Sequence, residues 1–304
     1  MSAGKVVVVG SLNADLTVRT ERFPSPGETL GGSELVIVPG GKSANQAAAA
    51  AILGAKVRLF GAVGADGHGD LLLEAAAEAG VDASLVLRRP DTATGTAMIV
   101  VDAAGENTII VSPGANGTLS GADLPAGLFD DAAVLCLSLE VPLETVAAAA
   151  KAGHQAGAAV LLNLSPYREV PAELLALTDV LLVNAHEAAQ VSGVADPAAD
   201  WEAVIEAFAG LGVNRAVITL GGDGAVVLDG TAAGEDRIVQ IAPVRVSAVD
   251  TTGCGDAFTA ATAARLAAGE TLPAAAGFAA KAGALAATLP GAQSSYPALA
   301  ALAG

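Results

Sequence analysis

The segment from Asp250 to Asp256, Asp-Thr-Thr-Gly-Cys-Gly-Asp, combines an anion-binding backbone with a carboxylate. Two glycines let the backbone curl so that consecutive N–H groups face one concavity. An Ala-rich helical stretch follows, and a helix N-terminus favours an anion. A carboxylate at such a place is useful if it removes the proton from a hydroxyl that attacks a phosphate. The segment therefore predicts phosphoryl transfer to an alcohol, with Asp256 as general base and three N–H groups as anion donors (Gly253, Cys254 and Gly255).

A second group of polar residues follows the first apolar run and a glycine pair. Asn, Asp and Lys side chains in a strand–loop–helix setting can donate to and accept from the hydroxyls of a polyol. Asp15 is expected at the end of the first strand, and the glycines before Ser43 let the backbone approach a ligand. Taken alone, these could be ordinary surface charges. Together they are a candidate sugar site: Asn13, Asp15, Gly41, Lys42 and Asn45.

Two further motifs lie at predicted strand ends. Asn184 and Glu187 stand where a strand passes into a helix, at the edge of a sheet where ligands bind. Glu187 could hold Mg²⁺ through water, or it could be an ordinary first-turn glutamate. The glycine-rich segment 219–224 joins two strands and could approach a flat ligand or a phosphate, although it could also be a simple turn; its residues are Thr219, Leu220, Gly221, Gly222, Asp223 and Gly224. The chain has no Walker A motif.

These residues require a frame of alternating strands and helices. Continuous apolar strands separated by helices predict an α/β fold, a doubly wound and mainly parallel sheet covered on both faces. Strands are expected at 6–9, 57–60, 133–137, 159–162, 180–183 and 216–219, with a strand pair at 225–228 and 237–241. An extended segment is expected from Ile238 to Val249. Helices are expected at 43–53, 71–79, 143–156, 173–177, 201–211, 257–268, 273–288 and 297–302.

Two segments interrupt this alternation of strands and helices, at about 15–38 and 95–111. The second alternates into a hairpin around the turn-rich stretch Asp102–Asn107. We expect residues 1–304 to form a single α/β domain. We expect these strands to form a small sheet attached to it, which acts as a lid.

The composition limits the partners. At 304 residues, 53% of them hydrophobic, the chain can build one large core. A net charge of −17 argues against a nucleic-acid surface, and no apolar run approaches the roughly 20 residues that span a bilayer. Two cysteines without metal-site spacing indicate a reducing, cytoplasmic setting.

The motifs together resemble the ribokinase-like (PfkB) carbohydrate kinase family. Asp250–Phe258 is similar to the family's signature D-T-x-G-A-G-D-x-F, and Gly40–Ala47 is similar to G-G-K-G-A-N-Q-A. Further matches span nearly the whole chain in family order: Gly10–Asp15, Phe23–Thr29, Gly105–Asn107, Asn184–Glu187, Thr219–Gly224 and Gly291–Gln293.

The resemblance implies ATP-dependent phosphorylation of a sugar hydroxymethyl group, with D-ribose as the first candidate. A nucleoside kinase (adenosine or pseudouridine) or another sugar kinase of the family is the alternative, and a non-catalytic sugar- or nucleotide-binding regulator is a remote one. It also implies that Glu140 binds sugar, that Ala280 lies beside adenine, and that the lid forms a homodimer. Besides Mg²⁺, it implies a K⁺ site made by Asp250, Thr252, Ala286, Leu289, Gly291 and Ser295. The family usually has Ala at the position of Cys254, where a thiol could make activity sensitive to oxidation.

Overall fold

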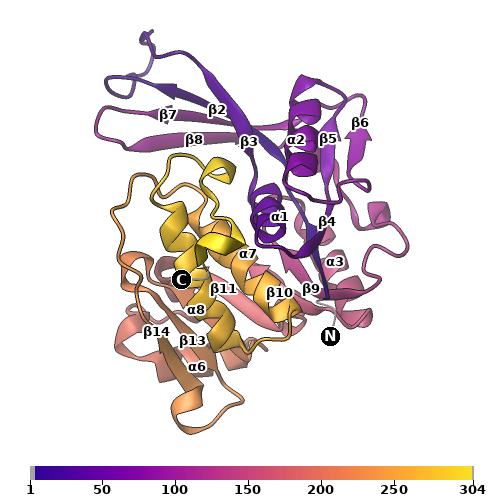
Figure 1. Ribbon diagram of the computed structural model, residues 1–304, viewed down its shortest axis with the longest axis vertical. Helices are drawn as coiled ribbons and strands as arrows, with labels where there is room; N and C mark the ends of the chain where they lie inside the picture. The colour runs from indigo at the N-terminus through magenta and orange to yellow at the C-terminus, as the bar shows by residue number, and fades with distance from the viewer. Residues whose placement is uncertain (1–3, 303–304) are drawn as a thin grey trace.

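The computed structural model of the protein describes residues 4–302. Its main sheet has eight strands, and β13 pairs antiparallel with both neighbours whereas all other pairs are parallel. The strand order is β14 (Ile238–Ile241), β13 (Ala225–Asp229), β12 (Arg215–Thr219), β11 (Val180–Asn184), β10 (Ala159–Asn163), β9 (Ala132–Leu137), β1 (Lys5–Val9) and β4 (Lys56–Phe60), as Figure 1 shows.

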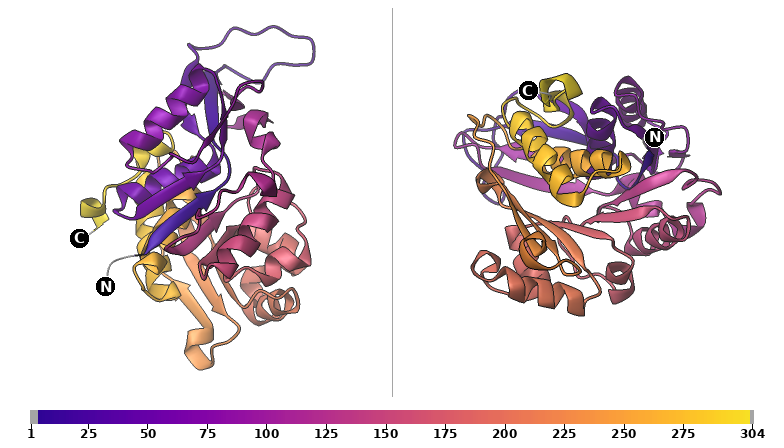
Figure 2. Two further views of the ribbon diagram at one scale, coloured as in Figure 1. Left: turned by 90° about the vertical axis from the view of Figure 1, so that its right-hand side faces the viewer. Right: turned by 60° about the horizontal axis from the view of Figure 1, so that its bottom comes forward.

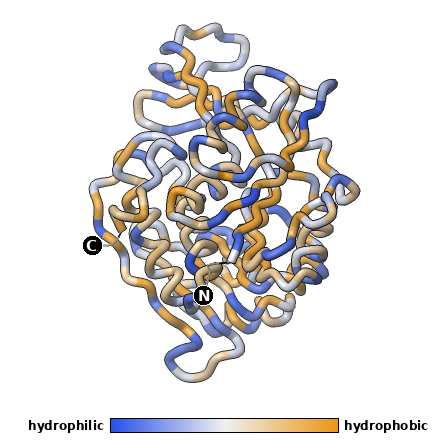
Figure 3. Tube along the Cα trace, turned by 45° about the vertical axis from the view of Figure 1, so that its right-hand side comes forward, coloured by the Kyte–Doolittle hydropathy of each residue, from blue (hydrophilic) through white to orange (hydrophobic). Residues whose placement is uncertain are grey.

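Helices cover both faces of this sheet (Figure 2). Side chains of β1 alternate between the faces, so that Val6 and Val8 join one apolar core while Val7 and Val9 join the other. The first core includes residues of α1 (Lys42–Ile52), α2 (Gly67–Glu78), α7 (Cys254–Ala267) and α8 (Leu272–Ala286). The second includes residues of α3 (Leu143–Gln155), α4 (Ala172–Ala176), α5 (Ala185–Ser192) and α6 (Trp201–Gly210). The chain that passes through the interior is accordingly coloured mainly hydrophobic in Figure 3. The predicted doubly wound α/β fold is confirmed.

A four-stranded sheet stands at one end of the molecule (Figure 1). Its strand order is β3 (Val36–Gly40), β2 (Asn13–Arg19), β7 (Gly95–Val101) and β8 (Asn107–Ser112). We call it the small sheet. It is built from the two segments that break the βα rhythm in the sequence. Two short strands, β5 (Ala62–Gly64) and β6 (Leu87–Arg89), form a separate pair.

Short 3₁₀ turns fill several connections. They are η1 (Gly114–Thr118), η2 (Gly121–Asp123), η3 (Pro197–Ala199), η4 (Gly221–Asp223), η5 (Gly234–Arg237), η6 (Gln293–Ser295) and η7 (Leu299–Leu302). Within residues 4–302, no helix has the length and apolar character needed to cross a bilayer.

Several details differ from the sequence prediction. Asp15 lies inside β2 of the small sheet, not at the end of the first strand. The helix after the glycine loop begins at Cys254 and not at Ala257, because Gly253 adopts a left-handed conformation and forms its N-cap. The strand from Ile238 ends at Ile241, so residues 242–249 form a loop. The last predicted helix, 297–302, is only the 3₁₀ turn η7, and the short strands β5 and β6 were not expected from the sequence.

The topology explains where a ligand would bind. β1 pairs with β9 on one side and with β4 on the other, so the direction of chain progression reverses beside β1. In open α/β sheets, ligands bind outside the carboxyl ends of the strands at such a reversal. The carboxyl ends of β1, β9, β11 and β12 and the segments that follow them lie at this edge, and they carry several of the predicted site residues: Asn13, Glu140, Asn184, Glu187 and Thr219.

Candidate active site

Asp256 lies in the first turn of α7, and only 7% of its surface is exposed. Two side-chain amides of α1 hold its carboxylate. Asn45 Nδ2 donates to Oδ2 at 3.0 Å, and Gln46 Nε2 donates to Oδ1 at 3.1 Å. Burial raises the pKa of Asp256, while Lys42 and the two amide donors oppose that rise. The proposed base is therefore a single buried carboxylate with both oxygens oriented.

The backbone before Asp256 is arranged for an anion. Gly253 has φ +74°, and a Cβ there would lie 2.7 Å from the Ala292 Cβ, so only glycine fits. Within the described part of the chain, the N–H groups of Gly253 and Gly255 have no hydrogen-bond acceptor, as expected at a helix N-terminus. Cys254 differs from the prediction, because its N–H already donates to the Thr251 carbonyl at 3.2 Å.

The predicted sugar residues meet where β1 passes into the small sheet. Gly41 has φ +89°, and a Cβ there would lie 2.7 Å from the Asn13 nitrogen, so glycine permits this close approach. Asn116, which the sequence analysis missed, donates from Nδ2 to Asn13 Oδ1 at 2.8 Å and also exchanges hydrogen bonds with the Leu12 backbone. Asn116 thus fixes the Asn13 amide so that its N–H₂ group is left for a ligand.

Three carboxylates gather around this point. Burial, and then the charges of Glu140 and Asp256, raise the pKa of Asp15 to about 7. Glu140 Oε2 accepts hydrogen bonds from Ser11 Oγ at 2.6 Å and from the Lys42 backbone N–H at 3.0 Å. The site is therefore rich in acceptors for hydroxyl groups, as a polyol site requires.

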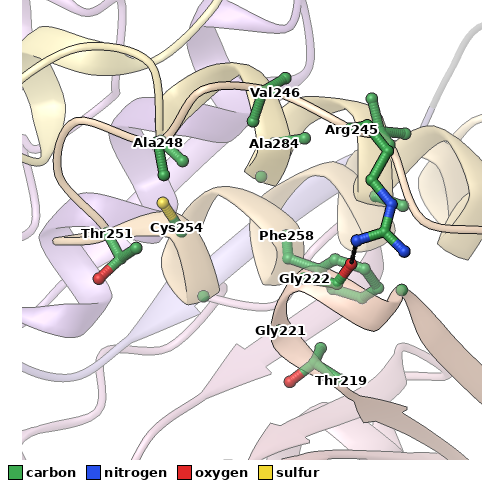
Figure 4. A pocket seen from close by; sticks show the side chains of 16 residues that line it. Thr219, Gly221, Gly222, Arg245, Val246, Ala248, Thr251, Cys254, Phe258 and Ala284 are labelled. Carbon is green, nitrogen blue, oxygen red and sulfur yellow. Dashed lines mark hydrogen bonds between the residues drawn. The ribbon is translucent and has the colours of Figure 1, made fainter.

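A pocket of about 310 Å³ lies on the other side of the α7 N-terminus (Figure 4). It is mainly apolar, and the Arg245 side chain reaches across to the Gly222 carbonyl at 3.2 Å. The sequence analysis predicted part of its lining: Thr219, Gly221, Gly222, Gly224, Cys254, Gly255 and Ala280. The remaining lining residues were not predicted and come from the loop 242–249, from the loop before α7, from α7, and from α8 with its C-cap: Val244, Arg245, Val246, Ala248, Thr251, Phe258, Gly283, Ala284 and Ala287. A flat apolar group with polar extensions suits this pocket.

A second, polar pocket of about 240 Å³ adjoins the first, because both include Thr219, Thr251 and Gly255. Besides these three, its lining contains residues from distant parts of the chain: Lys42, Asn163, Ser165, Leu182, Asn184, Glu187, Gly253 and Asp256. A path therefore leads from the apolar pocket, past the α7 N-terminus, to Asp256.

Some predicted residues lie outside both linings. The Leu220 N–H pairs with the Gly224 carbonyl, and Asp223 is exposed near Arg245. Glu187 lines the polar pocket, but its Oε2 also accepts the Asn184 N–H at 2.9 Å while Asn184 Oδ1 accepts the Glu187 N–H. This capping box is the structural role that the sequence also allowed. One Glu187 oxygen remains for another partner.

The residues of the expected K⁺ site are partly brought together. Asp250 accepts the Thr252 N–H at 2.9 Å and the Gly291 N–H at 2.8 Å, so its carboxylate joins two loops. Burial opposes ionisation, but these donors hold the pKa of Asp250 below its usual value. The Ala286 carbonyl accepts the Leu289 N–H at 3.3 Å, and Ser295 Oγ donates to the Ala292 carbonyl at 2.8 Å.

The sequence profile of the pfkB family carbohydrate kinases matches residues 3–299. The chain belongs to this family of carbohydrate kinases. A ribokinase of Schizosaccharomyces pombe is 38% identical over 307 residues, which cover 97% of this kinase and 95% of that protein. A ribokinase of Thermotoga maritima has a TM-score of 0.90 at 32% identity, covering 98% of both chains. The ribokinase of Arabidopsis thaliana complexed with ribose and ATP also has a TM-score of 0.90, at 33% identity, covering 99% of this chain and 97% of that one.

The kinase departs from the family signature at Cys254. Burial, followed by the charges of Asp250 and Asp256, raises the pKa of the Cys254 thiol to about 11. With a pKa this high, the thiol stays protonated at neutral pH. It is then weakly reactive, because the thiolate is the reactive form. The structure therefore argues against the oxidation sensitivity that the sequence suggested.

Proposed function

We propose that this carbohydrate kinase transfers the γ-phosphoryl group of ATP to the hydroxymethyl group of D-ribose, giving D-ribose 5-phosphate and ADP. The observation that carries the proposal is the position of Asp256, where the polar pocket meets the N-terminus of α7. The similarity to ribokinases over nearly the whole chain supports ribose as the sugar.

The site residues take different roles in binding and phosphoryl transfer, according to their positions. Asn13, Asp15, Gly41, Asn45 and Glu140 would bind the sugar hydroxyls and direct the hydroxymethyl group to Asp256. Asp256 takes the hydroxyl proton as the oxygen attacks phosphorus, and ADP leaves on the opposite side. The free N–H groups of Gly253 and Gly255 and the ammonium of Lys42 stabilise the negative charge of the transferring phosphoryl group.

ATP would place its base in the apolar pocket beside Ala280 and its phosphates along the segment 219–224. Within residues 4–302, no three acidic, His or Cys side chains form a metal cluster. Mg²⁺ would therefore be held mainly by phosphates and water, with the remaining oxygen of Glu187 as an outer partner. Bound there, it would neutralise charge on the phosphates.

The proposal is tested by ADP release measured with D-ribose, 2-deoxyribose, fructose, adenosine and pseudouridine. We expect the highest kcat/KM with D-ribose. Preference for a nucleoside would replace the substrate assignment within the same family. Binding of ribose and ATP without ADP release from any acceptor would instead favour the non-catalytic regulator. We also propose that the enzyme is cytoplasmic, since Cys136 and Cys254 are both free thiols, as a reducing compartment favours.

The small sheet would serve as the lid of a single kinase domain and as a dimer surface. Apolar side chains are exposed along its strands, with Ile109 52% and Ile110 60% exposed although they point to opposite faces of β8. Other exposed members are Leu35, Val36, Ile37, Val38, Met98 and Val111. Single exposed apolar residues are common on protein surfaces, but a group of this size is typical of a protein interface.

Replacing Ile109 with Asp should therefore shift the protein from dimer to monomer, because a buried, unpaired carboxylate opposes association. Light scattering at micromolar concentration measures the change. Leu299→Asp is the control, since Leu299 is also exposed and apolar but lies in η7. If the parent protein is already a monomer, the lid is not a dimer surface.

A monovalent cation should raise the turnover severalfold, K⁺ most of all. Asp250 joins the loop before α7 to the loop after α8, and backbone carbonyls lie beside it in sequence. Oxygen ligands of this kind suit a hard cation, which would hold the loop whose N–H groups face the phosphate. Turnover is measured with Mg²⁺ at fixed ionic strength, with choline chloride replaced stepwise by KCl.

Asp250→Ala should flatten this response. The alternative is that Asp250 only caps its turn and ties it to Gly291. In that case the parent enzyme would be equally fast with choline and with K⁺, and Asp250→Ala would lower stability alone.

A further inference from the structure

Gln46 is a buried amide that the sugar and nucleotide assignments leave without a task. It lies in the alanine run of α1 and is only 1% exposed. Its Nε2 lies 3.1 Å from Asp256 Oδ1 and 3.2 Å from Asn163 Oδ1. Its Oε1 is buried with no hydrogen-bond partner in the described chain. A buried acceptor without a partner is costly, so the position of this side chain calls for a functional reason.

The orientation of the Gln46 amide is determined by its neighbours. Asn163 donates its own Nδ2 to the Leu182 carbonyl at 3.3 Å, so Asn163 Oδ1 faces Gln46. Both groups opposite Gln46 are therefore acceptors, and only its N–H₂ end can face them. A flipped amide would place three oxygens together.

A second amide on Asp256 is fixed in the same way from another part of the fold. Gln293, in η6 near the C-terminal end, donates from Nε2 to Asn45 Oδ1 at 3.1 Å. The Asn45 Nδ2 then points to Asp256 Oδ2. The two carboxylate oxygens thus each receive one amide donor, and residues 248 positions apart in the sequence cooperate in holding one of them.

We propose that Gln46 and Gln293 are positioning residues of the phosphoryl transfer, which fix the plane of the Asp256 carboxylate and keep it ionised. Gln46 acts by direct donation, and Gln293 acts by orienting Asn45. The inference rests on the proposed role of Asp256 as general base. A carboxylate held by two donors cannot rotate out of line with the hydroxyl, and donors to the charged form favour the form that accepts a proton.

Several groups besides these amides influence the proton affinity of Asp256. The charged or titratable groups that interact with it are Lys42 of α1, Asp15 of β2, Glu140 after β9, Cys254 of α7 itself and Tyr296 near the C-terminal end. Burial and Glu140 raise the pKa of Asp256, whereas Lys42, Asn45 and Gln46 lower it. Removing one amide donor leaves the other influences in place, so the pKa should rise.

The test compares the pH dependence of kcat, at saturating ribose and ATP, for the parent, Gln46→Met and Gln293→Leu. Met keeps the length of Gln but donates nothing. We expect the acid limb of Gln46→Met to move to higher pH by about one unit, which is about a tenfold loss of turnover below the limb and a smaller loss above it. Gln293→Leu should move the limb in the same direction by less. Gln155→Met, an exposed Gln at the end of α3, is the matched control.

A merely structural role predicts a lower melting temperature and a turnover reduced equally at every pH. An acid limb that stays in place in the folded variants would overturn the inference, and if Gln46→Met does not fold, the half-buried Gln293 decides it. Carboxyl ¹³C titration of labelled Asp, with the Asp256 signal assigned by Asp256→Asn, reads the same shift without activity. A parent that releases no ADP would refute the proposed function, while an unchanged carboxyl titration in both variants would refute this inference.

Discussion

Asp256→Asn should lower kcat by about 10²–10⁴-fold, because that is the usual loss when a positioned general base is removed. The side chain keeps its size, so ribose and ATP should still bind. The two amide donors to the carboxylate also predict a change in the hydrogen bonds at this position. The amide oxygen of the variant can accept from either Asn45 or Gln46, but the new N–H₂ group must then face the other donor. The variant therefore loses one hydrogen bond, while it also removes a buried charge.

Steady-state kinetics and thermal melting are measured together for this variant. Asp70→Asn is the matched control, since Asp70 also lies in the first turn of a helix, α2, but it is exposed and pairs with Arg88. The control should turn over like the parent. A variant that melts like the parent and keeps more than about a tenth of its kcat would show that Asp256 is not the base.

The main sheet could be predicted from the sequence because its strands are short, continuous apolar runs buried on both faces. The apolar runs at β1 and β11 are too short for buried helices and therefore predict buried strands. The loop 242–249 has the pattern of a strand, because Val244, Val246 and Ala248 alternate with the polar residues Arg245 and Ser247. Their apolar side chains serve a different purpose, since all three line the apolar pocket. A periodicity of two records which side chains face an apolar surface, and here that surface is a pocket.

The site could be predicted wherever a residue type stands out against its neighbours. Asp256 beside two glycines does so, and so do Asn13 and Lys42. Asn116 does not, because it sits in a 3₁₀ turn and its partners, Leu12 and Asn13, are more than a hundred residues away. Such pairings exist only after the small sheet and the β1 loop have come together. The helix start at Cys254 was missed for a local reason: Gly253 caps the helix, so Gly255 is helical despite its low propensity.

Asp15→Ala should weaken ribose binding strongly while leaving the affinity for an ATP analogue near that of the parent. Asp15 lies in β2 beside the junction where Gly41 approaches Asn13, away from the apolar pocket. A lost carboxylate leaves sugar hydroxyls without acceptors, at about 1–3 kcal/mol for each unpaired group, or about 5- to 150-fold in affinity. Calorimetric titration with each ligand measures the difference, with Thr17→Ala in the same strand as control. Equal weakening of both ligands would contradict the assignment.

The pKa of Asp15 gives this prediction a pH dependence. The carboxyl is protonated below pH about 7 in the folded chain, against a usual value of 3.8. Between these values the folded state binds more protons than the unfolded state, so the contribution of Asp15 to stability is lost as pH rises through 7. Asp15→Ala should therefore raise the melting temperature relative to the parent more at pH 8 than at pH 5. Because the ionised carboxylate is the better acceptor, ribose affinity in the parent should increase from pH 6 to pH 8, and that increase should disappear in the variant. A parent whose ribose affinity is flat over this range would show that Asp15 binds the sugar in one protonation state throughout.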